Sequence, residues 1–100
     1  MTITTTINGD TLHLAIAGRL DTTTSMQLSN ELNVTYAEKA YNLVFDLKQL
    51  DYISSAGVGA LLMWAKRASA SGSAVEITGA AGLVEEVLRM TGLSAIVRNG

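Results

Sequence analysis

The part of the chain with the most chemical potential is residues 50–59, which read Leu-Asp-Tyr-Ile-Ser-Ser-Ala-Gly-Val-Gly. Two serines stand here directly before residues whose apolar spacing predicts a helix. The first turn of a helix has unpaired backbone N–H groups and partial positive charge, which stabilise a nearby anion. A phosphoryl group on Ser55 would lie beside the N–H groups of Ala56, Gly57 and Val58, and these small residues would not crowd it.

The same residues also have a purely structural interpretation. Ser54 or Ser55 can be an ordinary N-cap, because a serine oxygen accepts a hydrogen bond from an N–H group in the first helical turn. Gly57 and Gly59 can serve close packing of the helix. The residues alone therefore leave a cap and a phosphorylation site as alternatives.

Other chemistries lack the residues that they need. The chain has no cysteine and a single histidine, His13, which excludes thiolate sites and multi-histidine metal sites. The alternating pattern around His13 places it on the polar side of a strand. No Gly-x-Ser-x-Gly or Gly-x-x-x-x-Gly-Lys motif occurs, and Glu85 and Glu86 fit a solvated helix face. We expect no enzyme activity, no cofactor and no metal.

The composition indicates one small domain without affinity for nucleic acid or membranes. Of 100 residues 48% are hydrophobic, which suffices for a single core over residues 1–100. The net charge is −2 and the seven basic residues are scattered, so no patch for a phosphate backbone forms. The N-terminus has no signal-peptide pattern, and the apolar run at 56–65 is too short to span a bilayer. We expect a cytoplasmic protein.

Hydrophobic patterning predicts the elements that position the two serines. Residues 3–7 and 11–17 alternate and flank Asn8-Gly9-Asp10, which predicts a β-hairpin. A helix follows Asp21, with Leu28, Leu32 and Tyr36 as its buried stripe. A buried strand at 43–45 and a loop at 46–52 come next. A second helix begins at 55, has core positions 58, 61, 62 and 65, and stops at 71–73. A strand at 74–78 then leads to a third helix with core positions 83, 84, 87 and 88 and Gly92 as its cap, and a short strand at 95–97 follows.

This order, β-β-α-β-α-β-α-β, predicts an α/β layer fold with a mixed sheet of four to five strands and three main helices. The chain resembles the STAS domain family, whose founding members are bacterial anti-anti-sigma factors. Residues 18–21 (Gly-Arg-Leu-Asp) resemble the family's Gly-x-Leu-Asp segment, and residues 46–62 its central strand, phosphoserine loop and next helix. Residues 91–93 (Thr-Gly-Leu) resemble the Gly-Leu that closes the third helix. The resemblance covers essentially the whole chain.

The resemblance implies an anti-sigma factor antagonist, a phosphoprotein of transcription regulation that sequesters an anti-sigma factor. In regulated members the anti-sigma factor is itself a serine kinase, and a cognate phosphatase can reverse its action. The implied acceptor is Ser55. Ser54 stands where the family often has aspartate, which makes it a rival acceptor. Asp21 is either a helix cap or, by the resemblance, an acidic neighbour of the loop.

A second function is compatible with the same resemblance. Single STAS domains also occur beside ABC-type lipid transport systems. In such a subunit the interface would be constitutive and Ser55 would be only a cap.

The residue pattern of the helix that begins at Ser55 predicts an outer face that is unusually apolar. Opposite its core stripe lie apolar residues that include Met63 and Trp64, together with Arg67. An apolar outer face is typical of an interaction surface, where Trp, Met and Arg are enriched. We therefore expect Met63, Trp64 and Arg67 to contribute to a partner surface. The alternative is that Trp64 folds back over the edge of the domain.

Overall fold

The computed structural model describes residues 2–91 and 98–99 of the chain. Its elements are, in chain order, β1 (Thr2–Asn8), β2 (Thr11–Leu20), α1 (Thr22–Glu38), β3 (Asn42–Asp46), β4 (Leu50–Ile53), α2 (Ser55–Ala70), β5 (Val75–Thr78), α3 (Gly82–Met90) and β6 (Arg98–Asn99). The predicted Gly92 cap and the predicted strand at 95–97 lie outside the described residues. No helix in the described part is long and apolar enough to cross a membrane.

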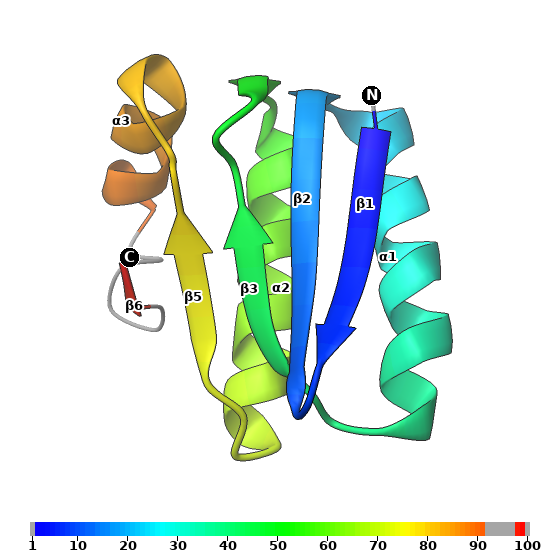
Figure 1. Ribbon diagram of the computed structural model, residues 1–100. Coiled ribbons are helices and arrows are strands. Elements are labelled where there is room, and N and C mark those ends of the chain that lie inside the picture. The colour runs from blue at the N-terminus through cyan, green and yellow to red at the C-terminus, as the bar shows by residue number, and fades with distance from the viewer. Residues whose placement is uncertain (1, 92–97, 100) are drawn as a thin grey trace.

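The sheet is mixed, and α1 and α2 cover one of its faces. The strand order is β1-β2-β3-β5-β6, and β4 pairs with β2 outside this path. Among the described strands only β1 runs antiparallel to its neighbour, and the other pairs are parallel. Figure 1 shows α1 and α2 behind the sheet, α3 beyond the end of β5, and no helix on the face towards the viewer. The predicted fold class, three helices on a mixed sheet, is confirmed.

The predicted hairpin forms as expected. Asn8 faces Thr11 across the end of β1 and β2, and Gly9 between them has φ +62°. A positive φ at the first central residue suits the two-residue turns that match the twist of paired strands, and glycine adopts it at no steric cost.

The prediction of a loop at 46–52 is wrong for its last residues. Residues 50–53 form β4, which pairs in parallel with the last part of β2, so β2 itself continues beyond residue 17 to Leu20. Two irregularities explain why the hydrophobic pattern of the sequence does not reveal this pairing. Gly18 has φ +92° with a register shift beside it, and β4 buries Leu50 and Ile53 at a spacing that does not alternate.

The core lies between the sheet and the two covering helices. Alternate residues of β2 and one stripe of α1 are buried, which confirms the predicted positions Leu12, Leu14, Ile16, Leu28, Leu32 and Tyr36. On α3 only Val84 and Leu88 are fully buried. Leu83, predicted as a core residue, is 65% exposed because this nine-residue helix at the side of the domain buries only a narrow stripe.

Trp64 corrects the predicted outer face of α2. Its side chain is completely buried, its ring meets Tyr36 of α1 edge-on at 5.9 Å between centroids, and its Nε1–H donates to Ser29 Oγ at 3.3 Å. The stripe that α2 buries is Gly57, Leu61, Trp64, Ala65 and Ala68. Because α1 packs beside α2, the buried sector is rotated towards Trp64 relative to the predicted one.

Trp64→Ala should therefore destabilise the domain by about 3 to 5 kcal/mol, the usual range for removing a fully buried tryptophan. Met63→Ala is the matched control, since Met63 precedes Trp64 on the same helix and is 49% exposed. Urea unfolding followed by circular dichroism measures both free energies. Equal effects of the two substitutions would show that Trp64 is not part of the core.

Candidate functional site

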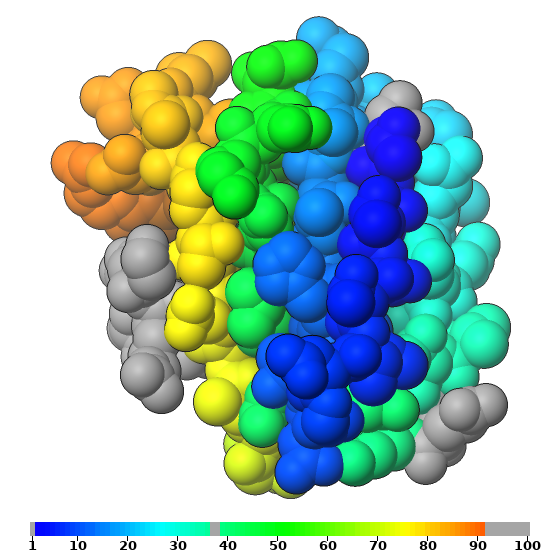
Figure 2. Space-filling model, viewed as in Figure 1, coloured from blue at the N-terminus to red at the C-terminus, as the bar shows by residue number. Residues whose placement is uncertain are grey.

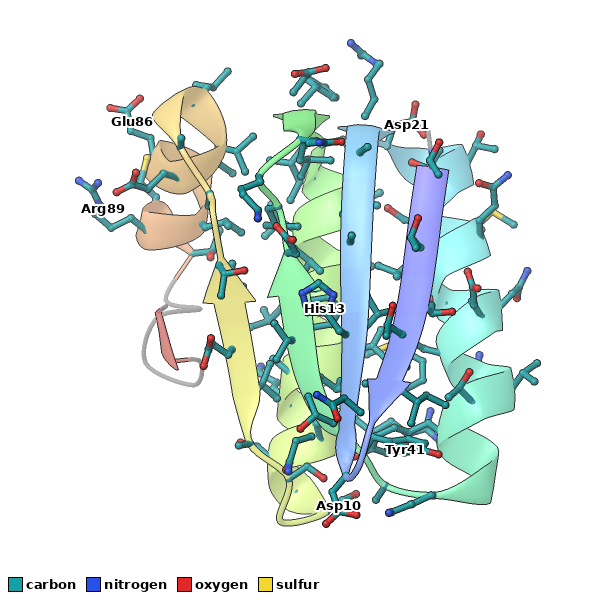
Figure 3. All side chains as sticks on the ribbon, in the orientation of Figure 1. Asp10, His13, Asp21, Tyr41, Glu86 and Arg89 are labelled. Atoms are coloured by element: carbon teal, nitrogen blue, oxygen red, sulfur yellow. The ribbon has the colours of Figure 1, made fainter. Side chains whose placement is uncertain are left out.

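The serine pair lies where the ends of β2 and β4 meet the first turn of α2. The Ser54 N–H donates to the Leu20 carbonyl oxygen at 2.9 Å, so the last residue of β2 is bonded directly to the loop. Asp21 follows Leu20 and begins the connection to α1. In Figure 3 Asp21 lies at this end of β2, and Asp10 and Tyr41 lie at the opposite end of the sheet.

Ser54 is the N-cap of α2. Its backbone is extended, with φ −92° and ψ 173°, and its Oγ accepts from the Gly57 N–H at 3.2 Å. The same hydroxyl donates to the Leu20 carbonyl oxygen at 3.3 Å. The two serines therefore differ in role, because the hydroxyl of Ser54 is used on both sides to hold the helix start against β2.

Ser55 is the first residue of α2 and is exposed. Within the described part of the chain its hydroxyl makes no hydrogen bond. The N–H groups predicted to surround it are only partly available, since the Gly57 N–H bonds to Ser54 Oγ and the Val58 N–H to the Ser54 carbonyl oxygen. The N–H groups of Ser55 and Ala56 are the ones that the capping serine leaves for an anion.

Position 57 requires a glycine because α2 packs closely against β2 there. A Cβ atom at this position would lie 2.5 Å from the Leu20 carbonyl oxygen and 2.9 Å from Cγ1 of Ile53. A Cβ atom at Gly59 would meet nothing within 4 Å. The predicted role of the glycines in close packing therefore holds for Gly57 and not for Gly59.

Asp21 is the N-cap of α1. Its side chain accepts from the Thr24 N–H at 3.1 Å, and Thr24 Oγ1 accepts from the Asp21 N–H at 2.8 Å, which completes a capping box. The backbone hydrogen bond from Thr24 is the main cause that holds the pKa of the Asp21 carboxyl below its usual value. Of the two predicted roles the structure shows the cap, while the position of Asp21 after Leu20 also brings it near the loop.

A hollow of about 380 Å³ opens beside Ser55, between β4, α2 and α3. Its lining residues are Tyr52, Ile53, Ser54, Ser55, Val58, Val87 and Thr91. Analysis of the sequence missed Tyr52 and Val87, because the residues around Tyr52 were assigned to a loop and Val87 was counted as core. Arg19 was missed too, and its Cζ atom lies 4.1 Å from the centroid of the Tyr52 ring.

The residues predicted to form a partner surface on α2 are not brought together on an open face. Trp64 is buried, as described above. Arg67 donates from its NH1 group to Asn33 Oδ1 at 3.3 Å, and its Cζ lies 4.8 Å from the Trp64 ring centroid, so it covers the seam between α1 and α2. Only Met63 remains exposed without a partner of this kind.

His13 lies on the uncovered face of the sheet, where Figure 3 shows its ring. Its Nε2 atom is 3.8 Å from Asp46 Oδ2, and 41% of its side chain is exposed. Among the described residues no group of three or more metal-ligating side chains occurs.

The architecture is that of the anti-sigma factor antagonists of known structure. TM1081 of Thermotoga maritima, described as a candidate anti-sigma factor antagonist, superposes with a TM-score of 0.88 at 23% identity, over 97% of this chain and 84% of that one. Unphosphorylated SpoIIAA gives 0.87 at 17% identity, over 99% and 88%. A variant of RsbS from Moorella thermoacetica gives 0.83 at 22% identity, over 100% and 86%.

The chain belongs to the STAS domain family. A family model described as "Mlab, STAS domain" matches residues 3–98. No curated protein matches the chain. At these identities the solved structures show the fold, and the function has to be argued from the site.

The two serines should respond differently to substitution. Ser54→Ala removes the cap and should cost about 1 kcal/mol of unfolding free energy. Ser55→Ala removes an exposed hydroxyl and should change stability by less than about 0.5 kcal/mol. Chemical denaturation of both variants checks this. A larger loss for Ser55→Ala would mean that Ser55 is the cap.

The two glycines of the first turns form a second matched pair. Gly57→Ala forces a methyl group onto the Leu20 carbonyl and should destabilise the domain by about 1 to 3 kcal/mol. Gly59→Ala meets no neighbour and should stabilise the helix by roughly 0.5 to 1 kcal/mol, because alanine loses less backbone entropy than glycine. Thermal unfolding distinguishes the two, and a stabilising Gly57→Ala would refute the close contact with β2.

Proposed function

We propose that this chain is a cytoplasmic anti-sigma factor antagonist, a protein-binding switch controlled by phosphorylation of Ser55. It would sequester an anti-sigma factor of the serine-kinase type and so release a sigma factor. The observation that carries the proposal is that the hydroxyl groups of the two serines are used differently. Ser54 fixes the helix, while Ser55 is exposed with a free hydroxyl in the described part of the chain.

This difference in hydrogen bonding favours Ser55 over Ser54 as the residue that accepts the phosphoryl group. A kinase that modified Ser54 would have to break the hydrogen bonds of its hydroxyl with Leu20 and Gly57. Modification of Ser55 breaks no hydrogen bond of the described residues. The hydroxyl also lies at a helix N-terminus, where the free N–H groups of Ser55 and Ala56 stabilise an anion.

The switch would act through charge at a docking surface. Phosphorylation adds between about 1.5 and 2 negative charges at neutral pH. The hollow beside Ser55 exposes the apolar side chains of Val58 and Val87, which a partner could cover. A phosphoryl group at its rim would have to be desolvated when the partner docks, so the modified protein would bind weakly. A cognate phosphatase would restore binding.

A second candidate is a constitutive subunit of an ABC-type lipid transport system. It rests on the resemblance to single STAS domains that occur beside such systems, and the matching family model is described as "Mlab, STAS domain" without naming an anti-sigma factor antagonist. In this function the hollow would be covered permanently and the hydroxyl of Ser55 would have no regulatory role.

Partner binding by charge variants tests the proposal. We expect Ser55→Asp to weaken binding of a serine-kinase anti-sigma factor about tenfold or more, equivalent to about 1.4 kcal/mol. Ser55→Ala should retain binding. Ser69→Asp is the matched control, because Ser69 is exposed near the other end of α2.

Isothermal titration calorimetry with a purified anti-sigma factor of the serine-kinase type gives the three affinities. Equal affinities for Ser55→Asp and Ser55→Ala would refute the switch. Tight and charge-insensitive binding to a transporter component would establish the second candidate.

A further inference from the structure

A guanidinium group without an ion-pair partner in the described part of the chain lies against Tyr52, one of the residues that line the hollow beside Ser55. Arg19 pairs in register with Tyr52 across the parallel strands β2 and β4, and its Cζ atom stacks 4.1 Å from the Tyr52 ring centroid. Arg19 is exposed and forms no salt bridge in the described part of the chain. Besides the hydrogen bonds from Thr24, its positive charge helps to lower the pKa of the neighbouring Asp21 carboxyl without a direct ion pair, so its N–H groups remain available to an anion.

Stacking on Tyr52 orients the guanidinium group of Arg19 so that it suits a phosphoryl group. A guanidinium group over an aromatic ring is held by its face, so its N–H groups remain free to donate in the plane of the group. Two parallel N–H···O bonds of this geometry match the oxygens of a phosphoryl group. A lysine at the same position would supply only a point charge.

The strands place this group next to the candidate acceptor. Leu20 and Ser54 are joined by two hydrogen bonds, and Arg19 and Ser55 are the residues directly before and after this bonded pair. Tyr52, which carries the guanidinium group, lines the same hollow as Ser55. From its place on the Tyr52 ring, an arginine side chain at the end of β2 is long enough to reach the rim where a phosphoryl group would stand.

The local charges make such a cation necessary. The strand ends that meet here carry Asp21 and the exposed Asp51, and carboxylates disfavour a neighbouring phosphoryl dianion. Four other basic side chains have different partners, since Lys39 pairs with Asp10, Lys48 with Asp46, Arg67 with Asn33 and Arg89 with Glu85, and Lys66 lies on α2. Arg19 is the cation on the strands that form the site.

We propose that Arg19, held on the ring of Tyr52, receives the phosphoryl group of phosphorylated Ser55 through its N–H groups. This inference rests on the proposed phosphorylation site and assigns a recognition residue to it. The contact stabilises the dianion and fixes the phosphoryl group over the hollow. The modified side chain then occupies the docking surface in one conformation.

The test uses the full chain with phosphoserine placed at position 55 during translation, so that no kinase is needed. ³¹P NMR follows the second ionisation of the phosphate, whose ordinary pKa is about 6. Arg19 favours the dianion and should hold this pKa below that value, so Arg19→Gln should raise it by about one unit. Arg19→Lys, which keeps the charge without the planar donor geometry, should give an intermediate value.

Arg89→Gln is the matched control, because Arg89 is exposed on α3 and is paired with Glu85 at 3.0 Å. It should leave the phosphate pKa unchanged. An Arg19→Gln protein that titrates like the parent would overturn the inference, as would equal shifts for Arg19→Gln and Arg89→Gln. Circular dichroism confirms that each variant is folded.

The readout separates this inference from the proposed function. A phosphate pKa that depends on Arg19, together with partner binding that ignores Ser55→Asp, would retain the recognition residue and reject the switch. Charge-sensitive partner binding with an unshifted phosphate would retain the switch and reject the role of Arg19.

Discussion

The carbonyl group of Leu20 is the point on which the rest of the site depends. Its oxygen accepts both the N–H and the hydroxyl of Ser54, at 2.9 and 3.3 Å. The same oxygen leaves no room for a Cβ atom at Gly57. One backbone group at the end of β2 thus fixes the cap of α2, the identity of a residue in its first turn and the distance between strand and helix. Because a buried carbonyl without a hydrogen bond is costly, this arrangement is strongly enforced.

The enforced arrangement explains why two adjacent serines behave differently. The residue that precedes a helix has its side chain directed back to the helix start, whereas the first helical residue points outward. Ser54 therefore becomes part of the framework, and Ser55 is displayed by it. A serine at the position where the family often has aspartate keeps the capping oxygen without its negative charge. The charged residues at the adjoining ends of β2 and β4 are Arg19, Asp21 and Asp51.

Most helices and strands could be predicted from the sequence, because the spacing of apolar residues indicates directly which positions are buried. The stripe Leu28, Leu32 and Tyr36 and the alternation in β2 gave the correct elements. The pattern failed where pairing is short and irregular, as in β4, whose register partner lies some 30 residues earlier behind a shift at Gly18. It also failed at Trp64, since the sector that a helix buries depends on a second helix packed beside it. Arg19 escaped notice because its significance comes from Tyr52, which no local pattern connects with it.

The face of the sheet without helices has a consequence for how such a domain can diverge. Figure 2 shows this face, formed by the four strands β1, β2, β3 and β5, and near one end it is hollowed over Ala15 and Ala17, between the threonines of β1 and Lys48. Its side chains are held by neither α1 nor α2, and they lie apart from the turn that displays Ser55. Substitutions at its exposed positions therefore leave the packing of α1 and α2 on the sheet unchanged. A domain built in this way can change the surface on one face of its sheet while the packing that holds its serine loop on the other face stays the same.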